Sequence, residues 1–290
     1  MKTTYDIGDD EIRIINRKHK PKKPLYSRWW FWLALFFAMA ALAAAIVAAI
    51  FVPLSKHNVE GNNADSETLV SEETVEPFLS DTASAKVLVG DTVVNDVMLT
   101  LFTPVNAKIE LCVGMPDTTL PELLLALQAA DIRADNREIV GAFVLKGELL
   151  SRGVAKKGFC AIIDGKIHLG MAESTSLFEE SIDKDGYFFR QYPLVCNGSL
   201  VENKPKGKSL RCALCELDGH IVVVRSLTRE SFHDFSQALV DIGVENAIYL
   251  VGGDAYGFCR TGDSVLSWSN AAFARQYKNT NFIVWKSLFR

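Results

Sequence analysis

An uninterrupted apolar run from Trp29 to Val52 constrains this chain of 290 residues more than any other feature. The run carries no charged residue, and a helix needs roughly 20 apolar residues to cross the ~30 Å hydrocarbon layer of a membrane. Tryptophans are concentrated at its first end, where indole rings favour the headgroup region. We therefore predict one transmembrane helix over residues 29–52, which anchors the protein in a membrane.

Positive charge is distributed unequally on the two sides of this run. Only Lys56 follows it closely, whereas the preceding segment carries Arg13, Arg17, Lys18, Lys20, Lys22, Lys23 and Arg28. Lysine and arginine are retained on the cytoplasmic side of membrane segments. We expect a cytoplasmic tail over residues 1–28 and an extracytoplasmic domain, on the periplasmic side of the inner membrane if the source is a Gram-negative bacterium.

Two other interpretations of the run were weighed. A cleaved signal peptide would use the small residues around Ala43 to Ala45, but the run exceeds the roughly 7–15 residues of an ordinary signal-peptide core. A buried core helix would normally show a polar face, which the run lacks. An uncleaved signal anchor is therefore favoured.

The segment over residues 53–82 is acidic, short of aromatics and rich in Asn, Ser and Glu. Such a composition cannot bury enough apolar surface to fold, so we predict a flexible stalk. A folded domain over residues 83–290 follows. The net charge of the whole chain is −4, and the folded part has no basic surplus to neutralise phosphates, so no nucleic-acid partner is expected.

Strand-like runs separated by turn dipeptides dominate the domain. Asp164-Gly165, Asn197-Gly198 and Asp218-Gly219 each separate two such runs, and these dipeptides tolerate the positive φ angles of tight hairpins. Further strands are expected at KVLV, VMLTLFT, AKIELCV, AIYLV and NFIVW.

Two helices are expected in addition. Thr119-Leu-Pro-Glu resembles a capping box that opens a helix through LLLALQAADI. A second helix starts near Thr228, with apolar residues at helical spacing and Gly243 suited to its end. The predicted fold class is α+β: a mixed or antiparallel sheet with several hairpins, packed by two or more helices and preceded by the transmembrane helix.

The first candidate site follows the strand AIYLV. Gly252 and Gly253 at a strand end would let a ligand approach the backbone, and Asp254 beside them could act as an acid or base. The alternative is an ordinary turn with a solvated aspartate.

The second candidate is Arg211, which follows a loop containing Lys204, Lys206 and Lys208. An arginine on a strand can hold a phosphate through two parallel hydrogen bonds. Lysine clusters between strands are mostly solvated, so Arg211 is predicted to bind substrate and the lysines are not.

The cysteines and histidines indicate no metal centre. Cys212 and Cys215 form a CxxC within a predicted strand, where residues three apart point to opposite faces. No second CxxC and no suitable histidine spacing complete a metal site, and no Ser-His-Asp arrangement can be assembled. We expect no metal and no cofactor.

The order of these segments resembles the phosphodiester glycosidase family over about Asn136 to Trp285. The resemblance is carried by VGAFVLKGELLSRGVAKKGFCAIIDGKIHLG, YPLVCNGSLVENK, SLRCALCELDGHIVVVRS with Arg211, the helix start at Thr228, and VENAIYLVGGDAYG. It implies a divergent, bacterial-type member with an N-terminal anchor, hydrolysing a sugar from a phosphodiester-linked glycan or conjugate. Arg211, Gly252 and Gly253 are the residues it implies for substrate binding.

The chain departs from the family pattern at two positions. Val140 stands where the family has the Asn of an Asn-Gly-Gly run, and Val251 where it has an Asp before the glycines. Apolar side chains cannot transfer protons. Two hypotheses follow: an anchored phosphodiester glycosidase in which Asp254 acts as the carboxylate, or a non-catalytic module that binds an envelope glycan or a partner protein.

Overall fold

The computed structural model describes residues 84–262, 264–269 and 271–288. The predicted cytoplasmic tail, transmembrane run and stalk lie outside the described residues and stay predictions. Within the described ranges, no helix combines the length and apolar character needed to span a bilayer.

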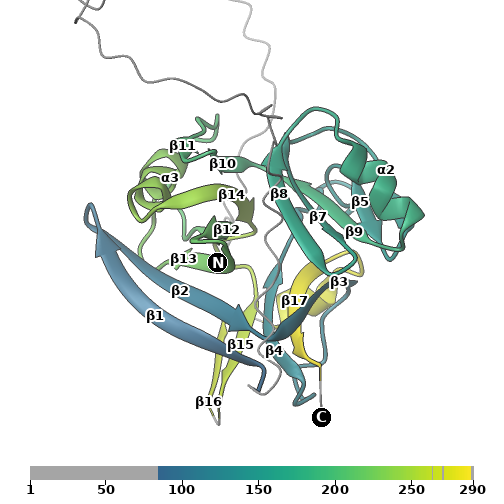
Figure 1. Ribbon diagram of the computed structural model, residues 1–290, viewed down its shortest axis with the longest axis horizontal. Helices are drawn as coiled ribbons and strands as arrows, with labels where there is room; N and C mark the ends of the chain where they lie inside the picture. Colours follow the sequence, from purple (N-terminus) through teal and green to yellow (C-terminus); the bar gives the residue numbers. More distant parts are fainter. Residues whose placement is uncertain (1–83, 263, 270, 289–290) are drawn as a thin grey trace, which may run out of the picture. The chain divides into compact units, whose positions relative to one another are not determined.

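Three sheets make up the described part of the chain, and every strand pair in them is antiparallel (Figure 1). The largest has the order β1 (Lys86–Val94), β2 (Val97–Val105), β13 (His220–Ser226), β12 (Cys212–Leu217), β14 (Val244–Leu250), β10 (Pro193–Cys196), β11 (Ser199–Leu200). The second has the order β16 (Ser264–Trp268), β15 (Gly257–Thr261), β4 (Leu123–Gln128), β17 (Asn281–Ser287), β3 (Ala107–Val113). The third has the order β6 (Glu148–Ser151), β5 (Phe143–Leu145), β9 (Tyr187–Gln191), β7 (Gly158–Ile163), β8 (Lys166–Met171).

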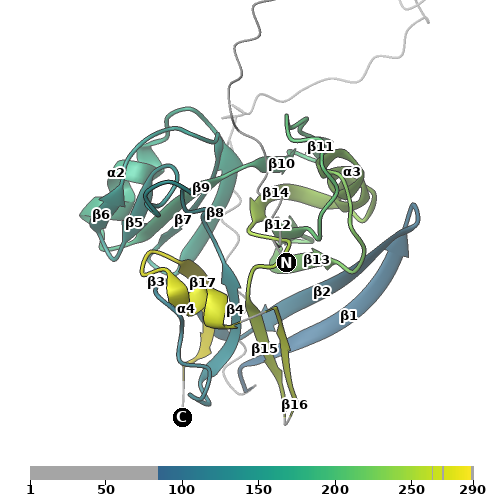
Figure 2. The same cartoon turned by 180° about the vertical axis from the view of Figure 1, so that it is seen from behind.

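Short helices cover parts of these sheets: α2 (Ser176–Asp183), α3 (Phe232–Asp241) and α4 (Ala271–Gln276), the last seen best from behind (Figure 2). The predicted second helix is α3, which begins four residues after Thr228. Its N-cap is Ser231, whose hydroxyl accepts a hydrogen bond from the Asp234 N–H at 3.0 Å. Gly243 follows its end with φ +91°, as predicted for a residue in the left-handed region.

The predicted hairpins are confirmed. Asp164-Gly165 joins β7 to β8, Asn197-Gly198 joins β10 to β11, and Asp218-Gly219 joins β12 to β13. All six turn residues have positive φ angles between 48° and 76°, which matches the right-handed twist of the flanking strands. Antiparallel sheets with few helices agree with the expected α+β class.

The helix predicted after Thr119 is wrong, because the segment LLLALQ is strand β4. All six residues of β4 are buried, since the strand lies between β15 and β17 within its sheet. A run that is apolar on every side has no periodicity that separates a buried strand from a buried helix. The apparent capping residues Pro121 and Glu122 stand before the strand instead.

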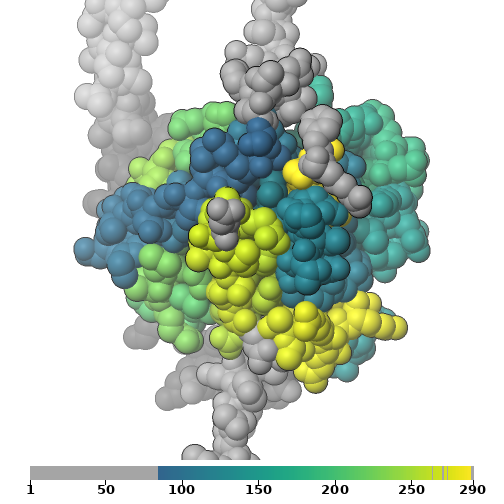
Figure 3. Space-filling view, turned by 90° about the horizontal axis from the view of Figure 1, so that it is seen from below, coloured from purple at the N-terminus to yellow at the C-terminus, as the bar shows by residue number. Residues whose placement is uncertain are grey.

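The main hydrophobic core takes side chains from all three sheets. Leu125 of β4, Phe189 of β9 and Leu214 of β12 are fully buried in it. A second core under α3 holds Phe235 and Leu239. Figure 3 shows the β15–β16 hairpin beside the β1–β2 ribbon, whose strands close through a turn at Asn95 and Asp96.

The chain passes from the third sheet into the largest one between β9 and β10, with only Tyr192 between these strands. The crossing is tight: a Cβ added to Gly158 of β7 would lie 2.5 Å from the Gln191 carbonyl oxygen. The end of β4 meets the end of β14 in the same region, because the Val251 N–H donates to the Gln128 carbonyl at 3.1 Å. Segments from all three sheets therefore end at one place.

Candidate functional site

The strand register sets Arg211 beside the glycine turn. Cys212 at the start of β12 pairs with Leu250 at the end of β14, so the residues just outside this pair are neighbours. The Gly253 N–H donates to the Leu210 carbonyl at 2.8 Å. The structure thus brings Arg211, Gly252 and Gly253 together, as the order of segments in the sequence suggested.

Arg211 is buried, with 6% of its surface exposed. Its Nε donates to the Glu230 carbonyl at 2.8 Å, and one Nη2 hydrogen goes to the Gly207 carbonyl. The guanidinium lies over the Phe232 ring, 4.1 Å from its centroid. Among the described residues no carboxylate lies within ion-pair distance of Arg211, so its charge is uncompensated.

The glycine turn is packed tightly against the residues before Arg211. A Cβ at Gly252 would lie 2.3 Å from the Leu210 carbonyl oxygen and 2.8 Å from the Tyr249 hydroxyl, so no side chain fits there. Asp254 lies on the exposed side of this turn, and its carboxylate makes no hydrogen bond or ion pair with the described residues. Its catalytic role stays a prediction.

A second cation, Lys156, enters the same region from the loop between β6 and β7. Its ammonium binds the Asp131 carboxylate and the Gln191 side-chain oxygen, the latter at 2.9 Å. It also lies 4.1 Å from the centroid of the Tyr192 ring, a favourable cation–π position. The Lys156 side chain is 9% exposed and that of Asp131 is 32% exposed.

Aromatic rings connect the two cations. Tyr192 meets Phe232 edge to face with centroids 5.3 Å apart, and Phe232 meets Tyr249 at 4.9 Å. Lys156 lies at the Tyr192 end of this row, and Arg211 lies over its middle ring, Phe232, and 5.8 Å from the Tyr249 centroid. We call the whole arrangement the strand-end cluster; its members are Asp131, Lys156, Gln191, Tyr192, Arg211, Phe232, Tyr249 and Gly252.

The Tyr249 hydroxyl lies inside the cluster and accepts a hydrogen bond from the Gly252 N–H at 3.0 Å. Burial raises the pKa of this phenol; the positive charge of Arg211 lowers it and the negative charge of Asp131 raises it. Tyr249 thus responds to charges contributed from two different sheets, and it remains protonated at neutral pH.

The two positions at which the chain departs from the family pattern converge on the segment after β4. The Val251 N–H donates to the Gln128 carbonyl at 3.1 Å, and the Val140 N–H donates to the Asp131 carbonyl at 2.8 Å. Asp131 therefore lies next to Val140 and three residues after Gln128, the backbone partner of Val251. The sequence did not indicate Asp131 as a site residue, because residues 123–132 are predicted there to form a helix.

Lys156, Tyr192 and Tyr249 were also missed. Lys156 sits in the polar loop SRGVAKK, which resembles a solvated turn. In the sequence, Tyr192 and Tyr249 resemble ordinary strand residues. The one usable signal was their place at the ends of strands, where side chains of different segments meet.

The cysteines behave as expected for an apolar strand. Cys212 joins the main core, whereas Cys215 joins the core under α3, so the two thiols point to opposite faces of the sheet. Burial raises the pKa of Cys212 to about 12 and also raises that of Cys215. Within the described ranges, no group of three or more potential metal ligands is present.

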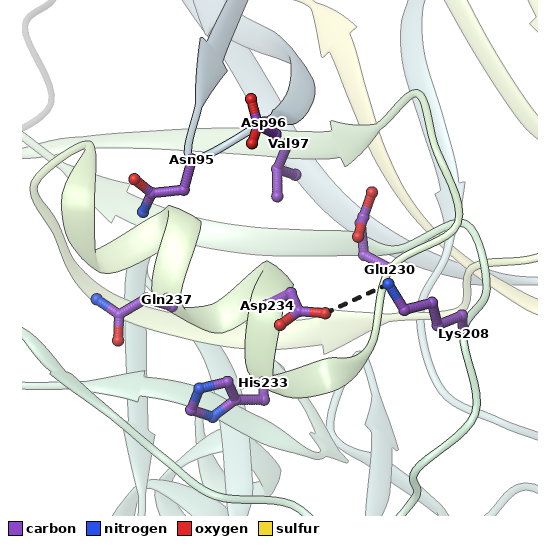
Figure 4. A pocket seen from close by; sticks show the side chains of 8 residues that line it. All are labelled: Asn95, Asp96, Val97, Lys208, Glu230, His233, Asp234 and Gln237. Atoms are coloured by element: carbon purple, nitrogen blue, oxygen red, sulfur yellow. Dashed lines mark ion pairs between the residues drawn. The ribbon is translucent and has the colours of Figure 1, made fainter.

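A shallow depression of about 390 Å³ lies on the outer side of Glu230, next to α3 (Figure 4). Lys208 lies across it and pairs with Asp234 at 3.7 Å. The acidic side chains outnumber this lysine: the lining residues are Asn95, Asp96, Val97, Lys208, Glu230, His233, Asp234 and Gln237. This charge balance suits a phosphate poorly, which leaves the strand-end cluster as the better anion site.

No protein-family model and no curated protein sequence matches this chain. Among solved structures, it is similar to the catalytic domain of zebrafish N-acetylglucosamine-1-phosphodiester α-N-acetylglucosaminidase, auto-inhibited by its pro-peptide, at 12% identity and a TM-score of 0.49 over 72% of this chain and 85% of that one. A hypothetical protein from Synechocystis is similar at 14% identity and a TM-score of 0.48, over 71% of this chain and 64% of that one. Neither similarity is close enough to assign a family or a site, so a function has to be inferred from the residues of this chain.

We expect Gly252→Ala to destabilise the protein, because the new methyl group would collide with the Leu210 carbonyl. Overpacking of this kind costs about 1–3 kcal/mol, so the urea midpoint of unfolding should fall. Gly207→Ala is the matched control, since a Cβ there meets no atom within 4 Å. Equal midpoints for the two variants would contradict the tight packing of the turn.

Proposed function

We propose that the folded domain is an extracytoplasmic, phosphodiester glycosidase-like protein whose strand-end cluster binds a sugar phosphodiester. The observation that carries the proposal is a pair of largely buried cations on one row of aromatic rings, with Lys156 over Tyr192 and Arg211 over the neighbouring Phe232. Buried cations without an equal number of carboxylates are costly unless an anion completes the site.

The chemistry of the cluster fits both halves of such a ligand. Arg211 uses Nε and one Nη2 hydrogen on backbone carbonyls and also interacts with the Tyr249 hydroxyl, so a phosphate oxygen would accept from a remaining N–H of its planar fork. Aromatic faces such as that of Tyr192 suit the apolar face of a sugar ring. The family resemblance also implies Gly252 and Gly253 as substrate-binding residues, and in this structure Gly252 is packed against the Leu210 carbonyl and the Tyr249 hydroxyl.

Hydrolysis requires an acid or a base in addition to binding. Asp254 is the predicted carboxylate, and its exposure leaves it free to meet a ligand. The alternative function is a non-catalytic module that binds an envelope glycan or a partner protein. It is favoured by one observation: the positions beside the segment after β4 are occupied by Val140 and Val251, which cannot transfer protons.

We expect Arg211→Ala to weaken binding of methyl phosphodiesters of hexoses and N-acetylhexosamines by roughly a hundredfold, because a charge-assisted contact in a shielded site is worth about 2–3 kcal/mol. Arg211→Lys keeps the charge but not the fork, so a smaller loss is expected. Calorimetric titration measures both, and exposed Arg229→Ala serves as the control.

Thermal unfolding of each variant separates lost binding from lost folding, since Arg211 also holds two backbone carbonyls. A folded Arg211→Ala protein with the affinity of the parent would rule out the phosphate role. Binding of the free sugars with the same affinity as the phosphodiesters would do the same.

Asp254→Asn distinguishes the two functions. If Asp254 is the acid or base, the variant binds a sugar phosphodiester with the affinity of the parent but releases no sugar. Asp183→Asn on α2 removes another exposed carboxylate and should leave hydrolysis unchanged. A parent protein that binds these compounds and hydrolyses none of them would favour the binding module.

The location is proposed from the charge asymmetry around residues 29–52. A reporter enzyme fused after Arg290 should be active only outside the cytoplasm. A protease that cannot cross the membrane, added from the outer side, should digest the domain. Complete protection from that protease would contradict this topology.

A further inference from the structure

Lys156 is unusual among the residues of its loop. The preceding residues Arg152, Gly153, Val154 and Ala155 are exposed, whereas the Lys156 side chain is only 9% exposed. Withdrawing an ammonium group from water is costly, and lysine is rarely buried without a specific partner. Contacts from the rest of the fold must therefore hold this loop so that the Lys156 side chain stays buried.

Arg190 of β9 supplies that restraint. The residue is 3% exposed, and its guanidinium donates to the carbonyls of Ala172 at 2.7 Å, Glu173 at 3.0 Å and Lys156 at 3.3 Å. Within the described residues no carboxylate pairs with Arg190. A second buried cation thus holds the Lys156 loop, where Asp131 ion-pairs with Lys156 and Glu173 ion-pairs with the exposed Lys157.

The partners of Lys156 differ in how firmly they are held. Gln191 is fully buried, and its side-chain oxygen also accepts from the Tyr192 N–H at 3.0 Å. Asp131 follows β4 on a connecting segment, and about a third of its side chain is exposed. Asp131 is therefore already partly hydrated and can turn toward water with a smaller rearrangement than Lys156 or Gln191.

We propose that Lys156 is a second anion-binding residue of the strand-end cluster, and that the Asp131 carboxylate pairs with the Lys156 ammonium group when no phosphate is bound. This inference rests on the proposed function, because it concerns the same ligand class. The bound phosphate would replace the Asp131 carboxylate on Lys156, so the ammonium keeps one anionic partner in both states.

The proposal predicts that the effect of Asp131 on anion binding depends on Lys156. Removing the charge of a carboxylate that competes for Lys156 strengthens the binding of an external anion only while Lys156 is present. A carboxylate that merely repels the anion through space would strengthen binding by a similar factor with or without Lys156. Asp131→Asn keeps the shape of the side chain, and the double variant Asp131→Asn, Lys156→Met separates the two cases.

The experiment titrates the full chain with inorganic phosphate and with the methyl phosphodiester of N-acetylglucosamine. Asp131→Asn should bind both about three- to tenfold more tightly, since one competing charge is lost. Lys156→Met should bind both roughly ten- to a hundredfold more weakly. The matched controls are the exposed neighbours Asp135→Asn and Lys157→Met, for which no change is expected.

Weaker or unchanged binding by Asp131→Asn would overturn the proposal, as would normal binding by a folded Lys156→Met protein. If Lys156→Met fails to fold, Lys156→Gln takes its place in the single and the double variant, and an Asp131→Asn gain that persists without Lys156 would overturn the proposal. Loss of affinity in Arg211→Ala together with an unchanged Lys156→Met would refute this inference and leave the proposed function standing. A parent protein that binds neither probe would refute both.

Discussion

The crossing of the chain from one sheet to another at Tyr192 is the constraint on which the site depends. With a single residue between β9 and β10, Gln191 and Tyr192 are fixed to two sheets at once. Gly158 permits this crossing because any side chain there would collide with the Gln191 carbonyl. The ends of β4 and β14 lie at the same place, so the side chains that follow these strands lie close together there.

Electrostatics give this junction its chemical character. Lys156, Arg190 and Arg211 are withdrawn from water. Backbone carbonyls accept from the two arginines, whereas Lys156 contacts the Tyr192 ring, the Gln191 side-chain oxygen and the Asp131 carboxylate. Carbonyls and aromatic faces orient a cation without neutralising it. The two cations of the cluster therefore differ: Lys156 has a carboxylate partner, and Arg211 has none among the described residues.

Local chemistry made much of the fold predictable. The Asn-Gly and Asp-Gly turns define three hairpins by their positive φ angles, and the apolar spacing after Ser231 defines α3 with Gly243 at its end. The failure at β4 has a physical reason, since a strand buried on both faces shows no alternation. The incorrect helix prediction also concealed Asp131, because a carboxylate at the end of a strand would have been a candidate site residue.

By itself the sequence determined the turns and the alternation of Cys212 and Cys215 across a strand, whereas the grouping of Arg211 with the glycine pair was implied only by the family resemblance. It also predicts the membrane anchor, from the length of one apolar run. Only the tertiary structure decided that Lys156 lies inside, that Asp131 is its partner, and that Tyr192 and Phe232 link it to Arg211. These contacts join residues from different sheets, and antiparallel pairing over long separations leaves no trace in local sequence patterns.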